Sequence, residues 1–197
     1  MKIVCVPYSE GSMGKNKGCE KAPELIINEL KRLHKEFSVE TIELDKTNSE
    51  EKLKNLGGAD IYIGGDHSIT YYSFLNFAKK FKNPGLLIFD AHPDFYPSQD
   101  IGFIGHEDWL YFLISKGLIK KDNIILVGIR AIDPREKTLL EKNKIRNYDI
   151  KVLYNNYEEV CNSIMEECRK FDGLYLSIDI DTLDPAFAPG TGYLEPA

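Results

Sequence analysis

The sequence predicts an α/β protein with three layers, in which helices cover both faces of a mainly parallel central sheet. Short apolar runs alternate with longer amphipathic runs along the whole chain of 197 residues. Most of the apolar runs lack strict polar alternation, which is typical of strands that are buried on both faces. No repeat, low-complexity tract or Gly/Pro/Ser-rich linker interrupts this order. We therefore expect residues 1–197 to form a single domain.

The expected elements follow from the length and composition of each run. Runs rich in Ile, Val, Leu or Tyr predict strands at Lys2–Pro7, Val39–Leu44, Asp60–Gly64, Leu86–Asp90, Asn123–Ile129, Lys151–Leu153 and Leu174–Asp179. The amphipathic runs between them predict helices at Ala22–Glu36, Ser49–Leu56, Ser68–Phe81, Glu107–Lys116, Pro134–Asn143 and Tyr157–Phe171.

Composition excludes several classes of function. The formal net charge of −6 gives no basic footprint for nucleic acid. No apolar run approaches the ~20 residues that a membrane-spanning helix needs. The apolar run at the N-terminus is too short for a signal peptide and is followed too soon by polar residues. The four cysteines form no CxxC pair, so we expect free thiols and a cytoplasmic location. His34 lies in a Lys/Glu-rich run and is predicted to be a solvated surface residue.

Three polar clusters occur where predicted strands end. They are Gly64–Ser68, Asp90–Asp94 and Asp179–Asp181. Ligands of open α/β sheets bind at the carboxyl ends of the strands, so the fold should gather these clusters along one edge.

The residue types in these clusters predict a metal centre. Four aspartates brought together would repel one another, and burying unpaired carboxylates costs several kcal/mol each. Two divalent cations would balance four carboxylates. A donor set rich in oxygen with some histidine suits Mn²⁺ better than Zn²⁺. Such a pair of ions can activate water for hydrolysis, for example of a planar guanidinium group.

Each cluster alone has a plain structural alternative. The DxHxD stretch could be a strand-end turn, and Asp66 or Ser68 could cap the helix that follows. The metal interpretation depends on the three clusters occurring together.

The motifs resemble those of the ureohydrolase family, which includes arginases, agmatinases and formimidoylglutamases. The matching stretches are GGDHS at residues 64–68, DAHPD at 90–94 and SIDIDTLDP at 177–185, and the last continues similarly to Gly192. The resemblance runs from the first strand to the last residue and implies an arginase-like fold with two Mn²⁺ ions per chain.

The resemblance also implies roles for individual residues. One ion would be held by His67, Asp90, Asp94 and Asp179, and the other by Asp90, His92, Asp179 and Asp181. His106 stands where the family has a proton-shuttle histidine, so His106 and Asp94 are expected to be catalytic. Asp133 and Glu136 match substrate contacts of arginases, although an Asp before Pro is also a common helix cap.

Some positions depart from the arginase pattern. Tyr96 and Gly102 stand where arginases hold the substrate carboxylate with Asn and Ser, and Tyr193 stands in place of a Thr. Arginine, agmatine and other guanidino compounds therefore all remain possible substrates.

Family members run roughly a hundred residues further, so the resemblance implies a C-terminally incomplete domain. The sequence predicts a hydrolase that releases urea from a guanidino compound. The alternatives are a formimidoyl hydrolase and a catalytically impaired metal-binding fragment or paralogue. Relatives form trimers or hexamers, which implies a homo-oligomer.

Overall fold

The computed structural model describes residues 1–33, 36–45, 47–98 and 104–197. His34 and Gly102, for which the sequence made predictions, lie outside the described residues. The chain divides into two compact units, Met1–Phe77 with Gly102–His106 and Ala78–Ile101 with Glu107–Ala197. The prediction of a single domain remains a prediction.

The first unit contains a three-stranded parallel sheet in the order β2-β1-β3. Its strands are β1 (Lys2–Val6), β2 (Ser38–Thr41) and β3 (Ile61–Gly64), and its helices are α1 (Ala22–Arg32), α2 (Ser49–Lys54) and α3 (Ile69–Ala78, whose last residue belongs to the second unit). The central strand β1 is the buried one, and its Ile3 and Cys5 pack against Ile27 of α1. β3 leads directly into the loop that carries His67.

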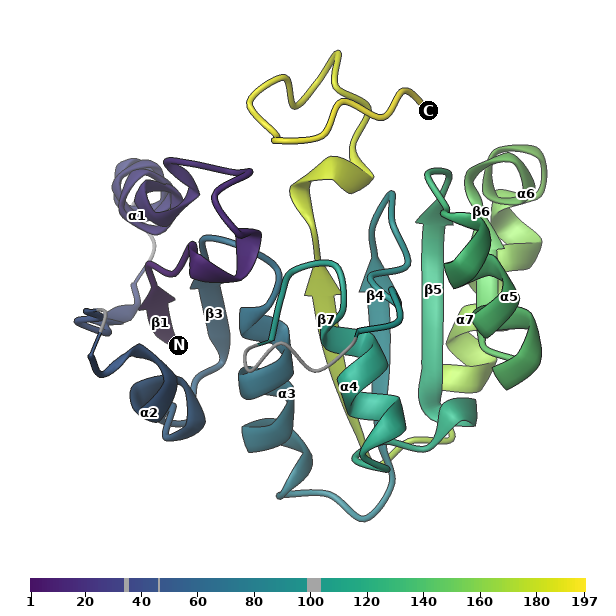
Figure 1. Cartoon of the computed structure of the whole chain (residues 1–197), viewed down its shortest axis with the longest axis horizontal. Helices are drawn as coiled ribbons and strands as arrows, with labels where there is room; N and C mark the ends of the chain where they lie inside the picture. The colour runs from purple at the N-terminus through teal and green to yellow at the C-terminus, as the bar shows by residue number, and fades with distance from the viewer. Residues whose placement is uncertain (34–35, 46, 99–103) are drawn as a thin grey trace. The chain divides into compact units, whose positions relative to one another are not determined.

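The second unit contains a four-stranded parallel sheet in the order β6-β5-β4-β7 (Figure 1). Its strands are β4 (Pro84–Phe89), β5 (Ile124–Ile129), β6 (Arg146–Asp149) and β7 (Gly173–Ile178). Its helices are α4 (Trp109–Ser115), α5 (Pro134–Asn143), α6 (Ile150–Asn155) and α7 (Tyr157–Cys168). The short 3-10 helix η4 (Ile180–Thr182) follows β7.

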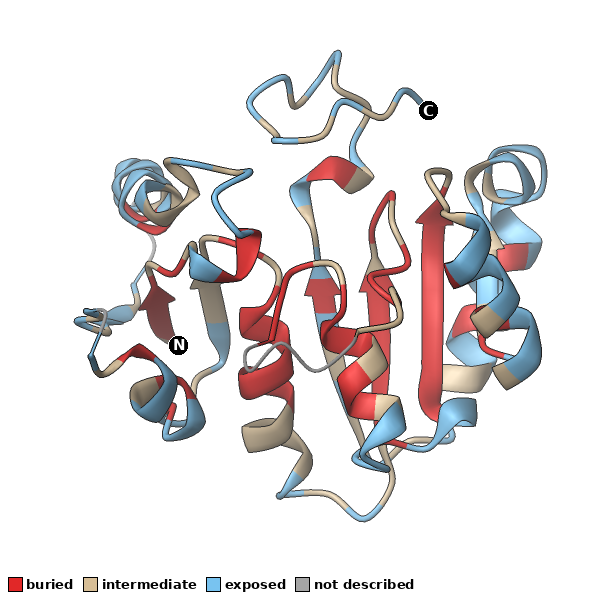
Figure 2. Cartoon of the chain, viewed as in Figure 1, coloured by how far each residue is buried: buried red, intermediate tan, exposed pale blue. Residues whose placement is uncertain are grey.

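One part of the core of the second unit lies under α7. Leu87, Ile125 and Val127 of the sheet pack against Val160 and Ile164 of α7. Every residue of β5 is buried, whereas β6 and β7 alternate between less and more exposed positions (Figure 2). The sheet therefore has a buried centre and two partly exposed edge strands.

A bulge at Gly128 changes the face that β5 presents. Val127 pairs with Tyr148, but Ile129 pairs with the next residue of β6, Asp149. Paired residues of a parallel ladder point to the same face, so Ile129 points away from the α7 side on which Val127 lies. Gly128 has φ of +92°, a conformation that side chains of other residues rarely adopt.

Most predicted elements are present with shorter ends, but one was wrong. The predicted strand Lys151–Leu153 is part of helix α6, and the strand lies earlier, at β6. The Asp149 side chain accepts a hydrogen bond from Val152 N at 2.8 Å and so starts the helix directly after β6. No helix within the described ranges has the length and apolarity needed to cross a membrane.

Candidate metal centre

Two of the predicted clusters meet at the carboxyl edge of the second unit's sheet. β4 and β7 are neighbours, and Phe89 pairs with Ile178 in a parallel register. The backbone N–H of Asp179 continues this ladder by donating to Phe89 O at 2.9 Å. Residues 90–94 and 179–181 therefore leave the sheet side by side, as the sequence predicted.

Asp90, His92 and Asp181 form the centre of this site. One ligand atom from each of them lies within 4.8 Å of the other two. His92 Nδ1 is 3.0 Å from Asp181 Oδ2 and 3.6 Å from Asp90 Oδ1. The two carboxylates are almost fully buried, with exposed fractions of 1% for Asp90 and 5% for Asp181.

Backbone N–H groups fix the orientation of these carboxylates. Asp90 Oδ1 accepts from His92 N at 2.7 Å, and Asp181 Oδ1 accepts from Ala91 N at 3.1 Å. Asp179 Oδ1 accepts from Asp181 N at 3.0 Å, which closes the turn of η4. The loops are thus built around their own aspartates, and each aspartate retains a second oxygen that can serve as a ligand.

The electrostatics of the cluster fit a bound cation. Burial alone would lower the pKa of His92, but its hydrogen bonds to Asp181 and Asp90 raise the pKa to about 11. The two buried carboxylates thus favour a positive charge at this place. A divalent ion would bring two positive charges to them, and oxygen with neutral imidazole nitrogen is a donor set that Mn²⁺ accepts.

Asp94 is held by two residues at the start of α4, Trp109 and Leu110. It is buried and has φ of +49°, a left-handed conformation for a residue other than glycine. Its Oδ2 accepts a hydrogen bond from Trp109 Nε1 at 2.7 Å, and its carbonyl accepts from Leu110 N at 3.2 Å. The start of α4 therefore fixes both the backbone and the carboxylate of Asp94.

Asp133 and Glu136 have structural roles in this arrangement. Asp133 caps α5 by accepting from Arg135 N at 2.8 Å, and Glu136 completes the capping box by accepting from Asp133 N at 3.2 Å. Glu136 is buried, and its Oε1 also accepts from Phe95 N at 3.0 Å, next to Asp94. The hydrogen bonds to Arg135 lower the pKa of Asp133 to about 2. The predicted substrate contacts of these two residues remain a prediction.

The C-terminal segment brings Tyr193, which the sequence singled out, and Glu195, which it did not, close to His92. The Tyr193 ring lies edge-on to His92, with 5.5 Å between ring centroids. Glu195 Oε1 lies 3.7 Å from His92 Nε2. Arg130 anchors this segment, because its guanidinium donates to the carbonyls of Asp181, Thr182, Leu183 and Glu195. The departure at Tyr193 is the signal that pointed to this region.

His67 and His106 belong to the first unit, where one network connects their loops. The buried Asp66 accepts from Ser68 N at 3.0 Å and from Ser12 N at 3.1 Å. Gly11 O, next to Ser12, accepts from His106 N at 3.0 Å. A Cβ on Gly11 would lie 2.3 Å from Ser68 Oγ, so this close approach requires glycine.

Comparison with known proteins identifies the family. The model of the arginase family matches residues 40–197. The chain belongs to the arginase family. The arginase of Staphylococcus aureus (strain COL) is 32% identical over 148 residues, which cover 67% of this chain and 48% of that protein. Arginase 1, mitochondrial, of Oryza sativa subsp. indica is 31% identical over 137 residues, which cover 69% of this chain and 39% of that protein. The chain spans about half the length, or less, of the curated relatives that it matches.

Solved structures confirm the fold class of the arginase-family chain. The arginase of Entamoeba histolytica, solved with L-ornithine, has a TM-score of 0.78 at 26% identity and covers 99% of this chain and 80% of its own. The formimidoylglutamase of Bacillus subtilis has a TM-score of 0.85 at 21% identity, with 99% and 69% covered. The three-layer α/β fold with parallel strands is therefore shown.

Proposed function

We propose that the chain carries the two-manganese centre of a hydrolase that cleaves a C–N bond of a guanidino compound and releases urea. Asp90, His92, Asp179 and Asp181 would hold one ion. His67, Asp90, Asp94 and Asp179 would hold the other. When bound, the ions would activate water for attack on the guanidinium carbon.

The buried cluster of Asp90, His92 and Asp181 carries this proposal. Two carboxylates at 1% and 5% exposure have the desolvation cost that a cation offsets, and they occupy the family's DxHxD and DxD motifs. Arg130 donates to the backbone carbonyls of Asp181 and Thr182, so these hydrogen bonds do not neutralise the carboxylates of the cluster. The donor set is thus suited to a metal rather than to a salt bridge with arginine.

The chain's own residues would orient and protonate the reactants. Trp109 and Glu136 hold the loop of Asp94 from two sides, which fixes a proposed ligand of one ion. His106 would transfer a proton to the leaving amine, as an imidazole can near neutral pH. Asp133 and Glu136 would contact the substrate from the start of α5, because a carboxylate that caps a helix can accept further hydrogen bonds.

Metal analysis and product analysis on the same protein test the proposal. We expect about two Mn²⁺ per chain and release of urea from arginine, agmatine or another guanidino compound. Asp181→Asn should lower the bound manganese. The matched control Asp122→Asn changes an exposed aspartate of the same unit that lies outside the cluster and should leave it unchanged. Equal metal contents in the two variants would contradict the site.

A second candidate function is favoured by Tyr193. Its ring occupies space beside His92, which is consistent with a metal-binding protein that does not turn over a guanidino substrate. Stoichiometric metal without urea from any guanidino compound would support this alternative. Formamide in place of urea would indicate a formimidoyl hydrolase.

Light scattering on the metal-loaded protein tests the proposed homo-oligomer.

A further inference from the structure

A pocket of 440 Å³ lies beside helix α5 in the second unit. The more buried face of α5 carries Glu136, Leu139, Leu140 and Asn143, at the spacing i, i+3, i+4 and i+7 of a helix that covers a sheet. The neighbouring face carries Lys137, Glu141 and the cap residue Lys144, which are exposed and line the pocket together with Leu140.

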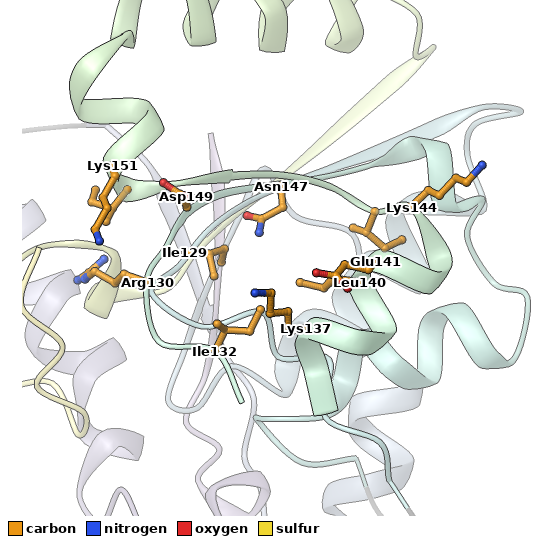
Figure 3. A pocket seen from close by; sticks show the side chains of 12 residues that line it. Ile129, Arg130, Ile132, Lys137, Leu140, Glu141, Lys144, Asn147, Asp149 and Lys151 are labelled. Carbon is orange, nitrogen blue, oxygen red and sulfur yellow. The ribbon is translucent and has the colours of Figure 1, made fainter. Parts of the chain in front are cut away.

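The walls of this pocket combine an apolar surface with cationic groups (Figure 3). Its apolar lining consists of Ile129, Ile132, Leu140, Ile145 and Ile150. Its remaining lining residues are Arg130, Lys137, Glu141, Lys144, Asn147, Asp149 and Lys151. The bulge at Gly128 places Ile129 on this wall, since a regular β5 would direct that side chain toward α7.

The charge of the pocket is opposite to that of the chain. Four cationic side chains against two carboxylates leave it two charges positive, whereas the whole chain has a net charge of −6. No salt bridge joins Lys137, Lys144 or Lys151 to another residue of the described part of the chain. In Figure 3 the ammonium group of Lys137 points into the middle of the pocket, while Lys144 extends away from it.

We propose that this pocket is a binding site for a small organic anion, a carboxylate with a short branched aliphatic body. The carboxylate would lie against Lys137, and the aliphatic body would cover the isoleucines and Leu140. The pocket extends along β6, from Lys144 and Ile145 before the strand to Asp149 at its end, and reaches Ile129 at the end of β5. Its volume is within the ~300–1,000 Å³ of small-molecule sites and holds roughly 15 waters at about 30 Å³ each. None of the proposed metal ligands lines this site, and the proposal does not depend on the proposed hydrolase activity.

Binding of 4-methylpentanoate, followed by NMR on ¹⁵N-labelled full chain, tests the proposal. We expect saturable shifts among residues 129–151 at millimolar ligand or below. The neutral analogue 4-methylpentanamide has nearly the same shape and should bind about fivefold more weakly, because it lacks the charge. Acetate should also bind more weakly, because it lacks the aliphatic body.

Variants on one helix separate the pocket from general surface charge. Lys137→Met keeps a long unbranched side chain and should weaken 4-methylpentanoate about fivefold. Lys142→Met removes the same charge from α5 outside the pocket and should have no effect. Lys151→Met, on a different element, gives a second test if the first variant folds poorly. The proposal is overturned if no shifts saturate by about 10 mM, if the amide binds as well as the acid, or if Lys142→Met and Lys137→Met have equal effects.

Discussion

At the scale of single residues, Trp109 shows how a side chain distant in sequence fixes the geometry of Asp94, a proposed metal ligand. Its ring is fully buried, and its Nε1 lies 2.7 Å from Asp94 Oδ2. Trp109→Phe removes this hydrogen bond while keeping a buried aromatic ring. Loss of such an outer partner usually lowers metal affinity by about tenfold or more, and we expect that reduction for Mn²⁺ in titration calorimetry.

Tyr111→Phe is the matched control, because it removes a hydroxyl from the same helix without touching Asp94. It should leave the Mn²⁺ affinity as it is. If Trp109→Phe also leaves the affinity unchanged, the hydrogen bond has no part in ordering Asp94.

Asp66 gives the first unit a pH-dependent stability. Burial raises the pKa of Asp66 to about 6 from its ordinary 3.8, although hydrogen bonds from Ser68 and Ser12 oppose the shift. Between these two pH values the folded chain holds a proton that the unfolded chain has lost, so stability falls as the pH rises. The size of this effect is about 3 kcal/mol at most, since one pKa unit corresponds to about 1.4 kcal/mol.

Asp66→Asn cannot ionise and should remove that loss of stability between pH 4 and pH 6. Urea unfolding with EDTA present, at both pH values, measures it without a contribution from metal. Asp122→Asn, an exposed aspartate, should retain the pH dependence of the original chain. Identical pH profiles for the Asp66→Asn protein and the unmodified chain would show that Asp66 is ionised throughout this range.

At the scale of elements, the sequence predicted the buried strands β4 and β5 well and the edge strand β6 poorly. β4 and β5 are apolar throughout, so their pattern is unambiguous. β6 reads Arg-Asn-Tyr-Asp, which has no apolar run, because an edge strand needs only one buried face. The neighbouring Lys151–Leu153 is more apolar and looked like a strand, but the Asp149 cap makes it a helix.

The sequence predicted those parts of the candidate site whose side chains directly follow a strand. Asp90, His92 and Asp181 stand next to strand ends, and strand pairing brings them together. Trp109 could not be assigned in this way because only the folded loop turns Asp94 toward α4. The contacts of Arg130 join residues 51 to 65 positions apart, and no local pattern encodes them.

Arg130 acts as a clamp between β5 and the C-terminal segment. Its guanidinium and Nε donate to carbonyls at residues 128, 181, 182, 183 and 195, a geometry that needs the planar group with several donors. We expect Arg130→Met to loosen the segment and to speed chymotrypsin cleavage after Phe187 several-fold. Arg146→Met, whose guanidinium pairs with Glu167, is the control and should leave that cleavage rate unchanged. Equal rates in both variants would mean that other contacts hold the segment.

At the scale of the whole molecule, the remaining question is the exposed apolar face of β7. Leu174, Leu176 and Ile178 are 41%, 51% and 63% exposed. They pair with Gly85, Leu87 and Phe89 of β4, so they lie on the face of the sheet that α7 covers farther along. β4 is the only strand that pairs with β7 within the described residues. An apolar face beside an open strand edge favours association.

We therefore expect the chain to self-associate in a concentration-dependent way, and Leu176→Glu to reduce this association. A charge on the apolar face would have to be buried without a partner in any interface formed there, at a cost of several kcal/mol. Light scattering across a range of protein concentrations should give a mass that rises for the original chain and stays near the 22.5 kDa of one chain for the variant. Tyr154→Glu adds the same charge at a side chain on α6 that is 84% exposed and should associate like the original chain. Two results would contradict the prediction. The first is a mass of one chain at every concentration of the original protein, and the second is equal association of the two variants. In either case the β7 face would not be the surface that drives association.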